Sequence, residues 1–270
     1  MSRDTTPFLA AEGGPATPAL VVGSGKGGVG KSLIAIGMSA ALAARGRKVL
    51  LVDGDQNLGN LHVLLGVRPV LTPASLLHDA ATPEELLIAV ATNLWLLPAD
   101  SGSESMHGLG ATDRARLHRR MTTVYRNFDT VIVDAAAGLD SALRCVSLHA
   151  TRLVVVTVPE ATALTDAYAL MKIVHGRLPS LPLDVVVNSV RGEHDGTTAY
   201  ARLAEAAQRF LNRTPRYLGS VPEDATLRGV ASTPHRLLGP AEGGMALSAI
   251  ARIALEELDA PVPASVAAVS

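Results

Sequence analysis

The chain has 270 residues, 48% of them hydrophobic, and a formal net charge of −1 at pH 7. This length and apolar content allow one large folded α/β domain, and the near-zero charge argues against a general positive field for nucleic acid. The single cysteine, Cys145, excludes an internal disulfide and a paired-cysteine metal site, and we expect it to be a buried core thiol. The sequence shows no signal-peptide pattern and no apolar run long enough to span a bilayer, so we expect a cytoplasmic protein.

The two ends of the chain differ in composition from the part between them. Residues 1–18 are rich in Thr, Pro, Gly and Ala without apolar periodicity, which predicts a flexible leader. Residues 260–270 contain only Ala, Pro, Val and Ser, and we expect a disordered tail there. A single α/β domain should therefore occupy residues 19–259, where short apolar runs alternate with helical patterns.

An apolar run over residues 19–22 is followed by a glycine-rich stretch and then by a helical pattern over 33–44. The stretch reads Gly25-Lys26-Gly27-Gly28-Val29-Gly30-Lys31-Ser32. Strand, glycine loop and helix, with the spacing G-x-x-x-x-G-K-[ST], predict a phosphate-binding loop whose N–H groups converge on a phosphate at the helix start. Lys31 would contact the β- and γ-phosphates of a nucleotide, and Ser32 would ligate Mg²⁺.

Lys26 is a second lysine in this loop and is not required by the spacing. Two cations so close together favour a polyphosphate ligand, with a solvated surface lysine as the alternative. The string resembles the deviant Walker A motif, K-G-G-x-G-K-[ST], of the MinD/ParA family of ATPases. That resemblance implies that Lys26 reaches across an ATP-bound homodimer to the nucleotide of the partner subunit, so that Lys26 and Lys31 both serve catalysis.

A continuous apolar run over residues 49–52 predicts a buried parallel strand, and it ends at Asp53-Gly54-Asp55. Acidic residues at the carboxyl end of a parallel strand lie where α/β folds bind their ligands. With the residues that follow, they resemble switch I of the MinD group, D-x-D-x-x-x-x-N-L-x-x-L-L-G. The resemblance implies that Asp55 orients the attacking water and that Asp53 lies in the outer shell of Mg²⁺. The alternative for either aspartate is to cap the helix that follows.

The pattern between residues 67 and 127 is less regular. Two short helices are expected over 67–92, where Thr82-Pro83-Glu84-Glu85 reads as a capping box, and a third strand is expected over 93–98. A loop over 100–110 then precedes a helix over 114–127 that carries five arginines. A solvated helix face explains this basic run, and an acidic partner is the alternative.

The apolar run over residues 130–133 ends at Asp134, which fits a Walker B aspartate that holds Mg²⁺. The residues after it resemble the family's switch II, D-[ST]-x-A-G, except that Ala135 replaces the hydroxyl residue. This departure removes a polar contact near the metal. It bears on the rate of hydrolysis rather than on nucleotide binding.

Three later segments complete the expected nucleotide site. The string over residues 159–172 is close to the FlhG branch of the family, and the resemblance assigns Glu160 a contact with the ribose bound to the partner subunit. A first-turn acid near a helix dipole is the alternative for Glu160. Asn188 ends an apolar strand in the family's adenine-contacting position, and an amide suits a base edge. Pro222 and Asp224 resemble the G-x-[IV]-P-x-D element beside the base, or else they are turn and cap residues.

Strands that alternate with helices predict a doubly wound, mostly parallel sheet with the nucleotide at the carboxyl ends of the strands. The resemblance to the MinD/ParA family covers residues 19–258 and is nearest to the FlhG (FleN) branch. It implies a Mg²⁺-dependent ATPase that hydrolyses ATP slowly, dimerises with ATP and regulates the number and placement of flagella. The implied partners are a FlhF-type GTPase and flagellar switch or transcription factors.

The resemblance also implies peripheral contact with the inner face of the cell membrane. The final helix, expected over residues 245–258, makes a poor anchor because it carries Glu256 and Glu257 and lacks bulky aromatic residues. The leader also lacks the D-Q-A-x-x-L-R element by which family members stimulate FlhF. The alternatives are a MinD- or ParA-like ATPase that positions a division site, DNA or cargo, and a module that binds ATP with little hydrolysis. The near-neutral charge argues against a nucleic-acid partner.

Overall fold

The computed structural model describes most of the chain. The described residues are 17, 19–55, 59–77, 80–100, 110–227, 237–238 and 244–258. The predicted leader apart from Thr17, the predicted tail and residues 101–109 of the predicted loop lie outside them.

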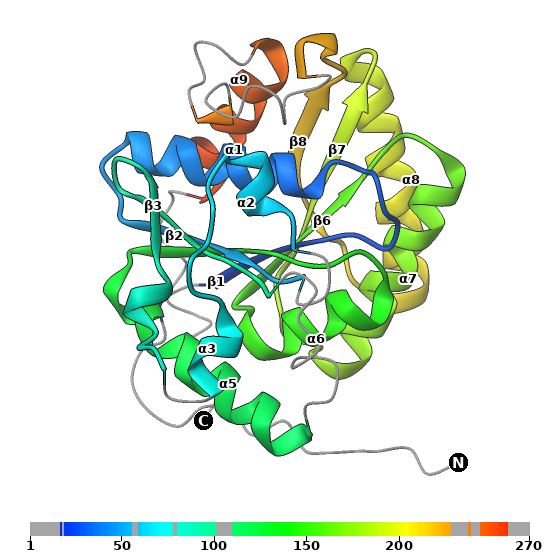
Figure 1. Cartoon of the computed structure of the whole chain (residues 1–270). Helices are drawn as coiled ribbons and strands as arrows, with labels where there is room; N and C mark the ends of the chain where they lie inside the picture. Colours follow the sequence, from blue (N-terminus) through cyan, green and yellow to red (C-terminus); the bar gives the residue numbers. More distant parts are fainter. Residues whose placement is uncertain are drawn as a thin grey trace.

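In the described part of the chain, eight strands form one sheet (Figure 1) in the order β3-β4-β2-β5-β1-β6-β7-β8. Their bounds are β1 Ala19–Gly23, β2 Val49–Asp53, β3 Ile88–Ala91, β4 Leu94–Leu97, β5 Thr130–Asp134, β6 Arg152–Thr157, β7 Leu183–Val190 and β8 Arg216–Pro222. Every neighbouring pair is parallel except β3 with β4. The chain builds one side of β1 with β2 to β5 and the other side with β6 to β8, so the predicted doubly wound, mostly parallel sheet is confirmed.

The helices connect these strands. Their bounds are α1 Lys31–Ala44, α2 Leu61–Leu64, α3 Pro73–Leu77, α5 Ala111–Thr122, α6 Leu139–His149, α7 Ala161–Arg177, α8 Glu193–Leu211 and α9 Gly244–Ile253. Short 3-10 turns span Glu84–Leu86, Thr123–Asn127 and Ala225–Leu227, and a π-helical turn over Ala254–Leu258 extends α9. None of the described helices is long and apolar enough to cross a bilayer.

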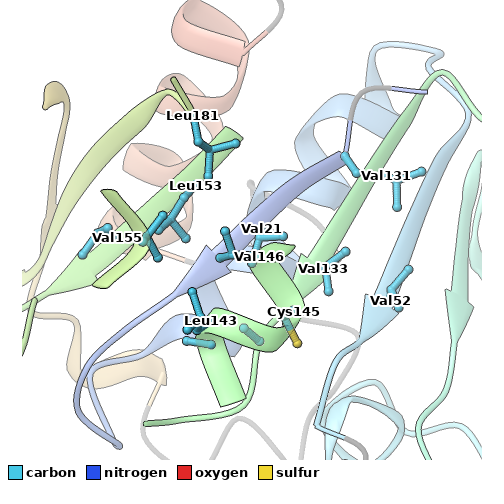
Figure 2. Close-up of a cluster of buried hydrophobic side chains, with 14 of the residues drawn as sticks. Val21, Val52, Val131, Val133, Leu143, Cys145, Val146, Leu153, Val155 and Leu181 are labelled. Atoms are coloured by element: carbon cyan, nitrogen blue, oxygen red, sulfur yellow. The ribbon is translucent and has the colours of Figure 1, made fainter. Parts of the chain in front are cut away.

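Two helical layers cover the sheet and bury its central strands on both faces. Helices α1 and α9 pack on one face, and α5, α6, α7 and α8 pack on the other (Figure 1). All residues of β1 and β2 are buried, as expected of parallel strands between two layers. In Figure 2, Leu143 and Val146 of α6 lie over Val21 and the neighbouring strands.

The single thiol, Cys145, belongs to this core, as predicted. Its sulfur lies beside β5 in Figure 2, and the residue is buried. Burial raises the pKa of the Cys145 thiol to about 11, so the thiol stays protonated and unreactive at neutral pH.

The prediction of two short helices over residues 67–92 is wrong in its second half. Residues Ile88–Ala91 form β3, an edge strand whose side chains alternate between half-buried and exposed. A turn containing Asn93, with φ of 60°, leads into the antiparallel partner β4. Four residues are too few to reveal a period of two, and all four of them are apolar, so the sequence lacks the alternation of apolar and polar residues that marks a half-buried strand. Half of the predicted capping box is present, because the Thr82 backbone N–H donates to the Glu85 carboxylate at 2.7 Å. The Thr82 hydroxyl donates to the same carboxylate at 3.0 Å instead of accepting from a backbone N–H, and the turn that follows is a 3-10 turn.

The amino-terminal edge of the sheet holds a buried acid that two arginines neutralise. Asp184 of β7 accepts hydrogen bonds from Arg216 of β8 at 3.1 and 3.2 Å. Arg152 of β6 lies 3.5 Å from the same carboxylate. These three side chains tie neighbouring strands together at the edge opposite the glycine-rich loop.

Candidate nucleotide-binding site

The glycine-rich loop joins the end of β1 to the start of α1, as predicted. Gly28 and Gly30 have φ of 78° and 88°, in the left-handed region that residues with a side chain rarely adopt. Gly30 is the N-cap of α1, and no side chain caps this helix end. The first N–H groups of α1 are thus left to an anion, which the positive helix end also attracts.

Two glycines of the loop are also required by close neighbours. A Cβ on Gly25 would lie 2.1 Å from the backbone oxygen of Asp166 in α7, and a Cβ on Gly30 would lie 2.2 Å from Nδ2 of Asn188. The same Nδ2 donates to the carbonyl of Val29 at 2.8 Å. The loop is therefore held between α7 and the carboxyl half of β7 before any ligand is present.

Lys31, Ser32 and Asp134 come together where the loop meets β5. The Lys31 side chain is nearly buried, with 8% of the residue exposed, and its charge acts on Asp134. The Ser32 hydroxyl donates to the Asp134 carboxylate. Burial is the main reason why the pKa of Asp134 rises to about 7, and the Ser32 hydrogen bond and the Lys31 charge oppose that rise.

Asp53 ends β2 directly beside Asp134 in the register of the sheet. Its carboxylate accepts hydrogen bonds from the backbone N–H of Asp55 at 3.2 Å and of Leu61, the first residue of α2, at 3.1 Å. Asp53 therefore makes the contacts of the capping alternative. Burial raises its pKa to about 6, although both hydrogen bonds favour the charged form.

The side chains at the ends of β2 and β5 fit a magnesium ion. Among the described residues, Oδ1 of Asp134 is buried and has no hydrogen-bond partner, and a buried carboxylate oxygen needs a cation or water. No three His, Cys, Asp or Glu side chains of the described residues cluster as a metal site. A site with one hydroxyl and one free carboxylate oxygen suits Mg²⁺, which keeps waters and phosphate oxygens as its other ligands. The predicted set of Ser32, Asp53 and Asp134 is thus adjacent, and its role remains a prediction.

Lys26 already has an anionic partner within one chain. Its Nζ lies 3.1 Å from a carboxylate oxygen of Glu160, and it also reaches the hydroxyl of Thr162 at 3.4 Å. Lys26 thus has an anionic partner in the ligand-free chain, and its contact with a nucleotide polyphosphate stays a prediction. Glu160 is the N-cap of α7 rather than a first-turn residue, and its side chain makes no cap hydrogen bond.

The residues predicted to lie beside the base are held by the protein itself. Asn188 is buried and donates from its Nδ2 to the Val29 carbonyl of the loop, and its contact with a base stays a prediction. Asp224 accepts hydrogen bonds from the Thr226 hydroxyl at 2.6 Å and from the backbone N–H groups of Ala246 at 3.1 Å and Thr226 at 2.9 Å. These bonds, and the one from the Thr226 hydroxyl first, hold the pKa of Asp224 below its usual value. These are the contacts of the turn-and-cap alternative. Pro222 ends β8, and its contact with a nucleotide stays a prediction.

Three further residues support the loop and were missed in the sequence. Ser24 is fully buried and donates to the backbone oxygen of Lys26 at 2.7 Å. Thr162 contacts Lys26, and the backbone of Asp166 limits residue 25 to glycine. Only Ser24 carries a local signal, since a small hydroxyl residue directly before a glycine turn is common in such turns. The other two contacts join segments more than 130 residues apart.

Comparison with known sequences identifies the domain. Residues 20–233 match the family model of the CobQ/CobB/MinD/ParA nucleotide binding domain. The chain is 32% identical to Antiactivator FleN of Pseudomonas aeruginosa, over 77% of this chain and 75% of that protein. It is 30% identical to Flagellum site-determining protein YlxH of Helicobacter pylori, over 78% of this chain and 72% of that protein.

Solved structures agree with this assignment. The cell division ATPase MinD of Pyrococcus furiosus superposes with a TM-score of 0.74 and 26% identity, covering 91% of this chain and 100% of that one. Septum site-determining protein MinD of Pyrococcus horikoshii, solved with Mg-ADP, gives a TM-score of 0.71 and 25% identity, covering 90% of this chain and 97% of that one. The chain therefore belongs to the CobQ/CobB/MinD/ParA family of nucleotide-binding domains.

Proposed function

We propose that this protein is a Mg²⁺-dependent ATPase that hydrolyses ATP slowly and acts as a dimeric switch. One observation carries the proposal: at the junction of the glycine loop with β5, Lys31 and Ser32 interact with the Asp134 carboxylate, one oxygen of which is buried and has no hydrogen-bond partner in the described part of the chain. A cation bound to phosphate oxygens would satisfy that oxygen. The likeness to MinD solved with Mg-ADP supports the choice of nucleotide and metal.

The residues of the site take distinct roles in this proposal. The N–H groups of residues 25–32 and the Lys31 ammonium hold the β- and γ-phosphates, and Ser32 and Asp134 hold Mg²⁺, with Asp53 in the outer shell. When bound, Mg²⁺ would neutralise charge on the phosphate oxygens. Asp55 orients the attacking water in line with the γ-phosphate. Asn188, Pro222 and Asp224 flank the base, and Glu160 contacts the ribose in the partner subunit.

The ion pair between Lys26 and Glu160 provides a physical basis for the proposed switch. Both residues are proposed to act across the homodimer interface, yet in one chain they neutralise each other at 3.1 Å. The pair must open before either side chain can reach a partner subunit. Their side chains are 40% and 63% exposed, so opening the pair costs roughly 1 kcal/mol or less. Binding of ATP by a second subunit can supply that free energy.

The biological role that we propose is regulation of flagellar number and placement. The similarity to FleN and to a protein named as flagellum site-determining supports it. A FlhF-type GTPase, flagellar switch proteins and transcription factors are the proposed partners, and contact with the inner face of the cell membrane is a further part of the proposal. Counting flagella per cell in a strain of the source organism that lacks the gene tests this role, and an unchanged count contradicts it.

A MinD- or ParA-like positioning ATPase is the second candidate function, because the same fold and loop serve both. A third is an ATP-dependent binding module with little hydrolysis. Ala135 favours the binding module with little hydrolysis, because its methyl group is buried in the core directly after Asp134 and offers the site no hydroxyl. The three functions share the nucleotide site and differ in the rate of turnover and in the partner.

The biochemical test measures ATP hydrolysis together with oligomeric mass. The variants are Lys26→Ala and Asp55→Ala, and their matched controls are Lys172→Ala and Glu205→Ala, which remove an exposed lysine and an exposed acid from α7 and α8. We expect slow turnover by the wild type, an ATP-bound dimer trapped by Asp55→Ala, and a monomer for Lys26→Ala. The controls should behave as the wild type does. Binding of ATP by a protein that stays monomeric in every variant would overturn the switch mechanism.

A further inference from the structure

A peptide group just beyond the end of β2 is held by side chains on both sides. It joins Gly54 to Asp55, the residue proposed above to orient the attacking water. Its N–H donates to a carboxylate oxygen of Asp53 at 3.2 Å, and its carbonyl oxygen accepts a hydrogen bond from the thiol of Cys145 at 3.5 Å. The orientation of this peptide group therefore depends on Cys145, which lies 91 residues after Gly54 in the chain.

The pairing of β2 with β5 reaches as far as Gly54. The Gly54 N–H donates to the backbone carbonyl of Asp134 at 2.9 Å, one step beyond the pairing of Asp53 with Asp134. A Cβ on Gly54 would lie 2.7 Å from that carbonyl oxygen and 3.0 Å from the Cys145 sulfur, so this position admits only glycine. The sheet thus fixes the N–H side of Gly54, and the thiol holds its carbonyl side.

The packing of α6 fixes the direction of the Cys145 side chain. Ala142, Cys145 and Val146 are buried in the same core, and α6 packs against β1. Their spacing places the three side chains on one face of the helix. The sulfur extends from this face toward β5 (Figure 2). Because a rotation of α6 that withdraws the sulfur would also disturb the packing of Ala142 and Val146, the thiol has a defined position.

The same sulfur is also bonded to the loop that follows β5. It accepts a hydrogen bond from the backbone N–H of Ala136, two residues after Asp134. Burial raises the pKa of the Cys145 thiol to about 11, so the thiol keeps its proton and donates it to the Gly54 carbonyl. One side chain therefore connects the two loops that resemble switch I and switch II of the family.

We propose that Cys145 is a positioning residue, which holds the Gly54–Asp55 peptide group in the orientation that directs Asp55 to the attacking water. This inference rests on the proposed ATPase function and on the role given there to Asp55. Cys145 acts through the backbone and needs no contact with the nucleotide. Since a displacement of about 1 Å can slow a reaction by up to 100-fold, even a weak hydrogen bond at this point affects the rate.

A positioning role and a packing role for Cys145 predict different kinetics. The other main parts of the site are held elsewhere: the glycine loop lies between β1 and α1, and Asp134 is paired with β1 on one side and β2 on the other. Loss of the thiol should therefore slow hydrolysis and leave nucleotide binding intact. A residue that only packs would instead lower the stability of the whole domain, without separating the rate of hydrolysis from the affinity for nucleotide.

The test compares kcat for ATP with the affinity for Mg²⁺ and a non-hydrolysable ATP analogue, using the full chain. Cys145→Ala removes the thiol, Cys145→Val fills the space without a donor, and Cys145→Ser keeps a donor and an acceptor. Val146→Ala, which truncates a neighbouring side chain of the same core, is the matched control. A second measurement follows exchange of the Asp55 backbone amide hydrogen with solvent in the ligand-free chain, which requires no hydrolysis.

We expect Cys145→Ala and Cys145→Val to lower kcat about tenfold and to change the nucleotide affinity less than about twofold. The Asp55 amide should exchange about tenfold faster in both variants, because the peptide group opens more easily. Cys145→Ser should stay within about threefold of the wild type in both measurements, since its hydroxyl makes the same kinds of bond. Val146→Ala should lower the stability and leave kcat within about twofold of the wild type.

Three kinetic results would overturn the proposal: equal losses of kcat and affinity in Cys145→Ala and Cys145→Val, no recovery in Cys145→Ser, or the same loss of kcat in Val146→Ala. A wild type that binds nucleotide without hydrolysing it would contradict the proposed ATPase function instead. Amide exchange then decides whether Cys145 holds the peptide group. An Asp55 amide that exchanges no faster in Cys145→Ala than in Val146→Ala would overturn that role.

Discussion

A buried aspartate lies at the amino ends of the strands and another at their carboxyl ends, and the two differ in how their charge is compensated. At the amino edge, Asp184 is 3% exposed in its side chain and is neutralised by Arg152 and Arg216. At the carboxyl ends, Asp134 is also buried, one of its oxygens has no hydrogen-bond partner among the described residues, and burial raises its pKa to about 7. Burial penalises both charges, but only the first is compensated inside the chain.

We propose that this difference separates a charge with a structural role, Asp184, from one that binds a ligand, Asp134. A buried acid whose hydrogen bonds are filled by its own chain has no capacity left for a ligand. An acid left partly unsatisfied is destabilising in the empty protein and becomes favourable once a cation arrives. Three variants and one change of pH test this contrast. The largest effect on stability is expected at Asp184, because its charge is compensated within the chain.

Asp184→Ala should be the most damaging change. It leaves Arg152 and Arg216 without their shared carboxylate at the ends of three neighbouring strands, and we expect the free energy of unfolding to fall by about 3 kcal/mol. Urea unfolding measures this loss. Asp195→Ala, an exposed acid at the start of α8, is the control and should change stability by less than about 1 kcal/mol. Equal losses in both variants would remove the distinction.

Asp134→Asn should have the opposite effect on the empty protein. The amide keeps the shape and removes a poorly solvated charge, so the melting temperature without ligand should rise by a few degrees. Mg²⁺-dependent nucleotide affinity should fall roughly 10- to 100-fold, as expected when a residue that orients a metal is lost. Calorimetric titration with and without Mg²⁺ measures this. A variant that binds Mg²⁺ and nucleotide normally would contradict the role given to Asp134.

The pH dependence of stability should follow the titration of Asp53 and Asp134, the two aspartates at the carboxyl ends of β2 and β5. Burial raises the pKa values of Asp134 and Asp53 in the folded state to about 7 and about 6, above the ordinary aspartate value of 3.8, so the folded state binds more protons between these values. Their contribution to the stability of the ligand-free protein should therefore decrease as pH rises through this window. Stabilisation by MgATP should instead decrease as pH falls through this window, because protonated carboxyls do not hold Mg²⁺.

Thermal shift with and without MgATP from pH 8 to pH 6 checks both signs. Asp134→Asn should flatten the part of the profile near pH 7. A stabilisation by MgATP that is independent of pH in the wild type would show that these acids do not titrate in the site.

Glu160→Gln should have the smallest effect on stability. The pair with Lys26 is exposed, and such pairs contribute roughly 0.2–1 kcal/mol. Unfolding of the ligand-free chain should therefore change little, in contrast to Asp184→Ala. Thr165→Ala, an exposed change on the same helix, is the matched control. A loss as large as that of Asp184→Ala would mean that the Lys26 pair is structural.

Much of the fold was predictable because its main signals are local. The apolar runs that became β2, β5 and β6 are uninterrupted, and parallel strands buried on both faces need no alternation. The edge strand β3 was missed because its four residues, Ile88 to Ala91, carry little periodic signal. Helix ends shifted by a few residues, as in α5, which begins at Ala111 although a helix over 114–127 was predicted.

The site residues were predictable where they belong to a local sequence motif. They were not predictable where distant segments come together only in the folded structure. Lys31, Ser32 and Asp134 were assigned from spacing and strand ends, and the structure brings them together. The pairing of Lys26 with Glu160 and the bond from Asn188 to Val29 join segments 134 and 159 residues apart, so no local pattern encodes them. Asp224 shows a further limit, since a cap and a ligand contact require the same residue type.

The close approach of Gly25 to α7 has a mechanical consequence. The glycine loop and the α7 backbone at Asp166 touch with no side chain between them, so there is nothing compressible to absorb a movement of either one. A phosphate that draws the loop inward must therefore shift α7 along with it. That helix begins immediately after Glu160, and its outer surface would report the state of the nucleotide to whatever rests against it.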